Sequence, residues 1–153
     1  MTAPFALNAD EGLAVAETAV AFAAAVPADR GLIYRELAAQ AVDGEVEYDL
    51  LPALERVLVL ALETGKAREI GKAETERHLL SIFRRTPGGK ALSQETADVN
   101  KVLAQFQGKE LTSARISARM PGKYQLDLSV DGFSIAITLE PGGLEVRSVE
   151  AGA

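Results

Sequence analysis

The chain has 153 residues, with 16 Lys and Arg against 22 Asp and Glu, and it contains no Cys and no Trp. Because it is 48% hydrophobic and 25% charged, it is expected to fold, which excludes a disordered tail. The missing Cys excludes a disulfide framework, a thiol nucleophile and any Cys-based metal site. The net charge of -6 argues against nonspecific binding of duplex DNA, which requires cations to neutralise phosphates.

Length and hydropathy predict one domain and no membrane partner. The longest apolar stretch, residues 12–26, is shorter than the roughly 20 residues that a membrane span needs, and Glu17 interrupts it. Asp10 and Glu11 stand where a signal peptide would carry Lys or Arg. We therefore expect a cytoplasmic protein. The wealth of Ala, and of Arg over Lys, is typical of a GC-rich bacterial genome.

Apolar residues recur at helical spacing from residue 8 to residue 107 and predict about five helices. The first covers residues 10–26 and begins at a capping box formed by Asn8 and Glu11. The second covers residues 32–42.

The third helix is the most buried, because the run Val57–Leu62 is apolar on every side. We expect Asp49 to cap it, Pro52 to lie in its first turn and Gly65 to end it. A buried strand is the alternative for this run. The acidic connector before it, residues 45–48, could form a short extended piece.

A fourth helix is expected over residues 73–85 and a fifth over residues 93–107, with a loop at residues 86–89 between them. The fifth carries an apolar stripe that could pack on the core or on a partner helix: Leu92, Thr96, Val99, Leu103 and Phe106.

From residue 111 onward the apolar residues alternate with period two, which predicts a four-stranded antiparallel meander. The turns are Pro121-Gly122, Asp131-Gly132 and Pro141-Gly142-Gly143, and Asp-Gly is a strong hairpin signal. The opposite face is polar and almost free of aromatic residues, which argues against a stacking platform for single-stranded nucleic acid. The predicted fold class is α+β: a single domain over residues 1–153, with a helical part (8–107) covering one face of a β-meander part (111–150).

Charge is segregated along the chain. Residues 1–64 hold 3 cations and 11 anions, residues 65–123 hold 12 and 6, and residues 124–153 hold 1 and 5. The cationic segment 66–90 suggests a site for an anionic ligand or an acidic partner, with these candidate residues: Arg77, His78, Arg84, Arg85 and Lys90. Two other interpretations stay open. The cations could pair within the chain with Glu69, Glu74 and Glu76, or could meet the acidic first part of a second copy.

Residue types that usually carry catalysis are sparse. His78 is the only histidine, and no Gly-x-Ser-x-Gly elbow supplies it with a nucleophile. Glu74 and His78 share a helical face at i, i+4, but two ligands do not make a metal site. We expect no metal, no cofactor and no catalytic residue.

Two motif-like segments also lack the residues that their chemistry needs. Residues 84–90 combine Arg, Gly and Lys without the spacing of a phosphate-binding Walker loop. Residues 32–39 suggest the first half of a helix-turn-helix, yet the helix after them holds Arg56 as its only cation before Lys66. Nucleic acid is therefore not an expected partner.

Together these features predict a small non-enzymatic protein-interaction domain of the adaptor, regulator or acidic chaperone type. We expect a homodimer, because amphipathic helices and segregated charge are what self-association uses. The alternative is a small-molecule or anion-binding domain, with or without enzymatic activity, that uses the segment 66–90.

Overall fold

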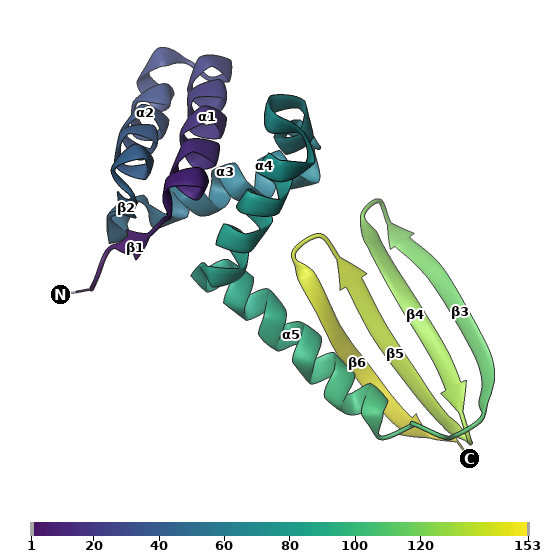
Figure 1. Cartoon of the computed structure of the whole chain (residues 1–153). Helices are drawn as coiled ribbons and strands as arrows, with labels where there is room; N and C mark the ends of the chain where they lie inside the picture. The colour runs from purple at the N-terminus through teal and green to yellow at the C-terminus, as the bar shows by residue number, and fades with distance from the viewer. Residues whose placement is uncertain (1, 153) are drawn as a thin grey trace. The chain divides into compact units, whose positions relative to one another are not determined.

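The computed structural model describes residues 2–152 and confirms the α+β class. Five helices precede a four-stranded antiparallel sheet (Figure 1). The chain forms two compact units, which meet in sequence between Lys90 and Ala91. We call the first the helical unit and the second the sheet unit. No helix among residues 2–152 has both the length and the apolar composition that crossing a membrane requires.

The helical unit contains four helices, a short 3-10 turn and a two-stranded ribbon. Its elements are β1 (Phe5–Ala6), α1 (Ala9–Ala25), α2 (Ala28–Asp43), β2 (Glu45–Val46), η1 (Tyr48–Leu50), α3 (Leu51–Glu63) and α4 (Lys66–Arg85). The largest buried side chains of its core are Val15, Leu37, Val46, Leu54, Val57, Leu58, Leu79 and Ile82.

The start of α1 confirms the predicted capping box. The Asn8 side chain accepts a hydrogen bond from Glu11 N at 2.9 Å, and the Glu11 carboxylate accepts one from Asn8 N at 3.0 Å. Small residues then let α1 and α2 pack closely. A Cβ atom on Gly12 would lie 2.2 Å from the carbonyl oxygen of Ala41, so only glycine fits there without moving a helix.

Strands β1 and β2 pair antiparallel, with Phe5 opposite Val46 (Figure 1). The extended piece within the acidic connector is thus confirmed. Its partner β1 was not predicted, because a strand of two residues shows no periodicity.

The run Val57–Leu62 is helical, as predicted, and Pro52 lies in the first turn of α3. The predicted cap at Asp49 is wrong. The residue before the helix is Leu50, and it makes no side-chain cap. Asp49 lies inside η1, whose 3-10 turn runs directly into α3 and takes the place of a cap.

Helix α4 begins earlier than predicted and contains a kink at Gly71 and Lys72, where the backbone is not helical. The segment after the kink matches the predicted helix over residues 73–85. Arg68 and Glu76 lie on either side of the kink and form a two-point ion pair with contacts of 2.5 and 3.0 Å. This pair therefore spans the interruption.

The loop predicted at residues 86–89 is wrong, since α5 (Pro87–Ala104) begins inside it. The Thr86 hydroxyl accepts a hydrogen bond from Gly89 N at 3.2 Å, as an N-terminal cap does. Pro87 takes the first helical position, where no N–H is needed. Proline and glycine at a helix start have the composition of a loop, which explains the error.

The sheet unit holds the predicted meander. Strands β3 (Leu111–Met120), β4 (Lys123–Val130), β5 (Phe133–Glu140) and β6 (Gly143–Ala151) pair in that order, with β3 and β6 at the edges. Asp131 and Gly132 both have positive φ, 44° and 81°, which is the two-residue hairpin turn that Asp-Gly predicts.

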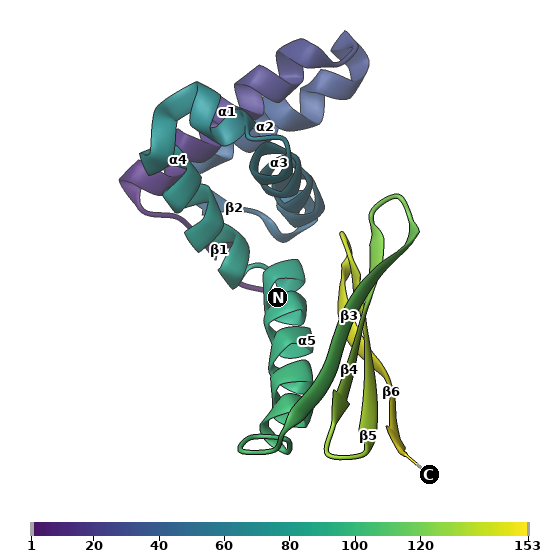
Figure 2. The same cartoon turned by 90° about the vertical axis from the view of Figure 1, so that its right-hand side faces the viewer.

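Helix α5 lies along one face of this sheet (Figure 2). Val99 and Leu103 of α5, with Phe106 in the turn that follows the helix, form a core with apolar residues of β4, β5 and β6: Leu126, Leu128, Val130, Ile135, Ile137, Leu144 and Val146. The second half of the predicted apolar stripe thus packs on the sheet, whereas Leu92 and Thr96 from its first half are exposed. No residue of β3 belongs to this core, although β3 alternates in the same way.

Candidate functional site

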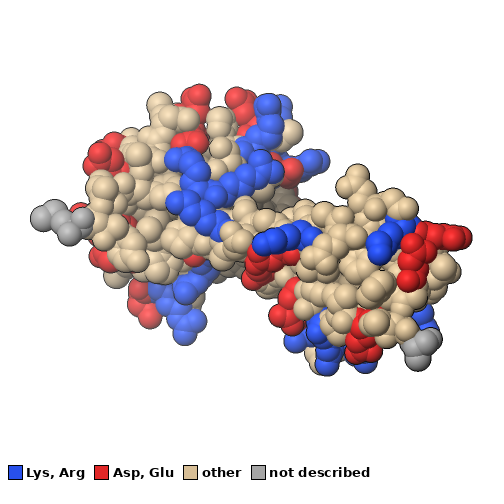
Figure 3. All heavy atoms as spheres, turned by 90° about the horizontal axis from the view of Figure 1, so that it is seen from below, with Lys and Arg blue, Asp and Glu red and all other residues tan. Residues whose placement is uncertain are grey.

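Four of the five predicted anion-site residues lie on α4, and Lys90 lies in the first turns of α5. Arg77 and Arg84 are exposed and stand seven residues apart, so they share one helical face. Neither they nor Lys90 forms an ion pair within residues 2–152. Figure 3 shows Lys and Arg side chains gathered on the visible face of the helical unit.

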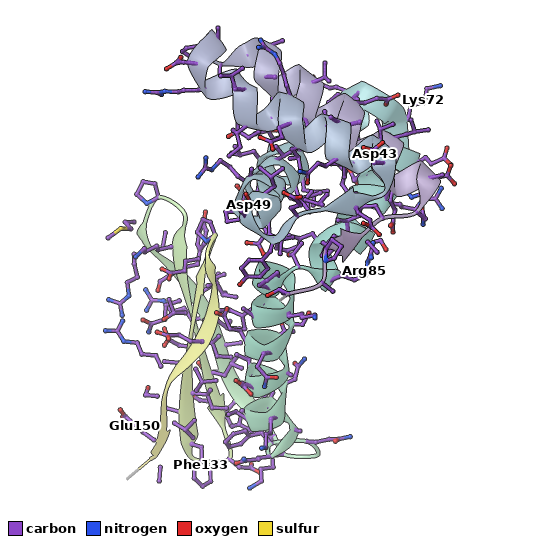
Figure 4. The ribbon with its side chains drawn as sticks, turned by 90° about the vertical axis from the view of Figure 1, so that its left-hand side faces the viewer. Asp43, Asp49, Lys72, Arg85, Phe133 and Glu150 are labelled. Carbon is purple, nitrogen blue, oxygen red and sulfur yellow. The ribbon has the colours of Figure 1, made fainter. Side chains whose placement is uncertain are left out.

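Arg85 is bound by groups of the helical unit, although its side chain remains 44% exposed. Its guanidinium binds the Glu11 carboxylate at 2.7 Å, donates to the carbonyl oxygen of Ala6 at 3.0 Å and lies 5.2 Å from the centre of the Phe5 ring. Glu11 is 7% exposed and is the same residue that caps α1. Arg85 therefore joins the end of α4 to the β1–α1 junction, which it reaches as Figure 4 shows.

His78 is half-buried, and its Nε2 atom lies 3.9 Å from Glu74 Oε1. It borders a shallow hollow of about 150 Å³ whose charged lining is acidic, with Asp10, Glu17 and Glu74. The structure thus places His78 among carboxylates and not among the arginines.

Other cations of the segment 66–90 pair within α4, as the internal-pairing interpretation expects. Lys66 contacts Glu69 at 2.8 Å. The hydrogen bonds from Arg68 lower the pKa of Glu76, and the Glu76 carboxylate raises the pKa of Arg68.

An acidic hollow of about 620 Å³ lies where α2, β2 and η1 meet. Its lining comprises Thr2, Pro4, Gln40, Asp43, Glu45, Glu47, Tyr48 and Asp49. Figure 4 labels Asp43 and Asp49 on this part of the helical unit. No group of three or more Asp, Glu or His side chains among residues 2–152 is close enough to hold a metal ion. The acidic connector is apparent in the sequence, but the hollow was not predicted.

Strand β3 is the part of the sheet that departs most from expectation. Its apolar residues were predicted to face the core, yet Ile116 is 62% exposed and Met120 55% exposed. Ala114, which precedes Ile116, and Ala118, which lies between Ile116 and Met120, are exposed as well. The stripe of these four residues, which we call the β3 apolar stripe, continues the sheet face that α5 covers over β4–β6.

The opposite face of β3 and β4 is polar, as predicted. Arg119 donates to Gln125 Oε1 at 2.6 Å, and Gln125 donates in turn to Asp127 Oδ1 at 2.6 Å. The guanidinium of Arg119 is therefore bound to a neutral amide and has no carboxylate partner among residues 2–152.

Comparisons of the chain with protein-family models, with curated proteins and with solved structures found no match.

Proposed function

We propose that the chain is a cytoplasmic, non-enzymatic protein-interaction domain of the adaptor, regulator or acidic chaperone type, which self-associates with the dimer as its smallest form. The observation that carries this proposal is the exposed β3 apolar stripe. Single exposed apolar residues are ordinary on a protein surface, but a contiguous stripe on an unpaired edge strand favours contact with another chain.

The composition of β3 supports the same conclusion. Edge strands that avoid association are commonly short, interrupted by proline or marked by a charge that points inward. β3 has 10 residues, contains no proline, and carries Ala114, Ile116, Ala118 and Met120 along its apolar side. Its two register shifts lie near its ends, between Leu111 and Ser113 and between Ala118 and Met120, and the run between them pairs regularly with β4.

The experiment is sedimentation velocity on the purified chain between about 1 and about 100 µM, where linkage makes self-association depend on concentration. We expect a dimer or larger species, and we expect Ile116→Thr to weaken association about tenfold by removing apolar contact while retaining a β-branched residue. Leu32→Gln is the matched control, because Leu32 on α2 is also 62% exposed. A wild-type monomer throughout this range, or equal effects of the two variants, would contradict the proposal.

A second candidate function is anion binding by Arg77, Arg84 and Lys90. Of the other two residues predicted for this site, His78 borders an acidic hollow and Arg85 binds Glu11, so neither supports it. The exposure of the first three, and the lack of ion pairs to them within residues 2–152, favours it. Titration with inorganic pyrophosphate tests it by calorimetry. Arg77→Gln with Arg84→Gln should abolish the heat of binding, whereas Lys66→Gln, which removes a cation already paired with Glu69, should not.

A further inference from the structure

The two edges of the sheet carry opposite charges on the same face. On β3 these are Arg115 and Arg119, and Arg115 lies opposite Asp127 of β4. On β6 they are Glu145, opposite Thr138, and Glu150, opposite Ser134. Figure 4 shows Glu150 on the side of the sheet that faces away from α5. None of these four charged residues forms an ion pair within residues 2–152.

The spacing of the two carboxylates matches that of the two guanidinium groups. Glu145 and Glu150 are five residues apart in sequence, but a register shift in β6 absorbs one residue, so their partners Thr138 and Ser134 are four positions apart on β5. Arg115 and Arg119 are four residues apart in sequence, and Arg119 lies at a register shift of β3, between Ala118 and Met120, just as Arg147 lies at the shift in β6. At roughly 3.3 Å per residue both pairs span about 13 Å.

The direction of the strands matches as well. In a four-stranded antiparallel meander β3 and β6 run in opposite directions, so β6 of a second copy placed beside β3 in the same orientation lies antiparallel to it. If Arg115 then stands opposite Glu150, Arg119 stands opposite Glu145. In this register the apolar faces also coincide, because Ile116 stands opposite Val149, which is 46% exposed.

We propose that β3 of one copy pairs antiparallel with β6 of a second copy in this register, with two cross-strand ion pairs on one face and an apolar row on the other. This rests on the proposed self-association and names its surface. Because each contact uses two different edges, every dimer keeps one free β3 and one free β6, and further copies can add.

Charge disfavours the alternative in which β3 pairs with β3 of the partner. The register that places Ile116 opposite itself would gather Arg115 and Arg119 of both copies along one seam, and β3 contains no carboxylate to offset them. In the head-to-tail contact each arginine meets a carboxylate. Arg147, the one cation of β6, lies at the register shift and outside the paired positions.

A charge exchange tests the proposal with the full chain. Arg119→Glu gives a chain with acidic residues on both edges, and Glu145→Arg gives one whose β6 is basic like β3. We expect each variant alone to lose association at least about tenfold, and an equimolar mixture to form dimers through the unchanged β3 of the Glu145 variant and the unchanged β6 of the Arg119 variant. The double variant Arg119→Glu with Glu145→Arg exchanges the charges in every contact and should associate like the wild type, because the exchanged pair is again complementary. Far-UV circular dichroism verifies that both variants fold. Lys101→Glu, on α5, is the charge-matched control and should behave as the wild type.

A cross-link tests the register. The chain has no Cys, so Ile116→Cys and Val149→Cys each introduce a single thiol. When the two variants are mixed, we expect a disulfide to form between them, because directly opposite residues have the Cα spacing that a disulfide requires. One variant carries a mass tag, so that the mixed dimer can be told apart from dimers of a single variant. Cross-linking of Ile116→Cys with itself would instead establish β3–β3 pairing and overturn the proposal.

The outcomes separate this inference from the proposed function. A wild-type chain that associates, while both charge variants associate equally well alone, would overturn the strand pairing and leave self-association intact. A wild-type chain that is monomeric would overturn both.

Discussion

The fate of individual charges in the segment 66–90 depends on their neighbours. Arg85, at the end of a helix, was expected to face an external anion, yet it binds Glu11, 74 residues away in sequence. Burial explains the preference. Glu11 is 7% exposed, and a carboxylate removed from water requires a cation and hydrogen bonds to offset its lost hydration. Sequence spacing contains no information on such a long-range pair.

The pair across the α4 kink gives a pH prediction. The hydrogen bonds from Arg68 hold the pKa of Glu76 below its ordinary value of 4.5. A lowered folded-state pKa means that the pair stabilises the fold above pH 4.5, and that this contribution is lost as the pH falls through the folded-state value. We expect Arg68→Gln to raise the pKa of Glu76 in an NMR titration of the carboxyl carbon. Lys66→Gln is the control, and an unchanged Glu76 in the Arg68 variant would contradict the assignment.

Among the elements, the helices and strands with strong periodicity were predictable and the interruptions were not. The meander follows from period-two alternation, and α1 from its capping box. The kink in α4 depends on two backbone conformations, at Gly71 and Lys72, that no hydrophobic pattern records. The start of α5 was missed for the opposite reason, because Pro87 and Gly88 belong to both helix starts and loops.

The kink also predicts a stabilising substitution. Lys72 has φ 63° and ψ -158°, a region of backbone conformation that is almost restricted to glycine and costs other residues about 1–3 kcal/mol. We expect Lys72→Gly to raise the free energy of unfolding, measured by urea denaturation, by about 1 kcal/mol. This value is the relief of backbone strain minus the backbone entropy that glycine loses on folding. Lys72→Ala should give no such gain. Equal effects of the two variants would indicate that the side chain, and not the backbone, limits stability.

The exposure of β3 could not be predicted either. Alternation shows which side chains share a face, but not whether a helix covers that part of the face. The stripe of α5 is one helix wide and contacts β4, β5 and β6. Ile116 therefore follows the pattern of a core residue while its side chain stays exposed. The β3 apolar stripe is therefore a candidate site because its residues alternate like those of a core strand, while α5 does not cover them.

At the scale of the whole molecule, the two units have separate buried cores, one around Leu58 and one around Ile135. We expect Leu58→Ala to cost about 2–5 kcal/mol in the helical unit, and Ile135→Ala a similar amount in the sheet unit. If the cores unfold independently, urea denaturation followed by NMR amide signals will show each substitution shifting only its own unit. The single domain expected from the sequence stays a prediction, and a common shift of all signals would support it.

The charged edges of the sheet have an electrical consequence. Arg115 and Arg119 lie on one edge strand, and Glu145 and Glu150 lie with the single cation Arg147 on the other, so we expect the sheet unit to carry a dipole moment across its strands. At about 0.01 M salt the screening length is roughly 30 Å, so this dipole can orient an approaching charged surface before contact. An association rate constant that depends on ionic strength, with a dissociation rate constant that depends on it less, is the kinetic signature of such steering.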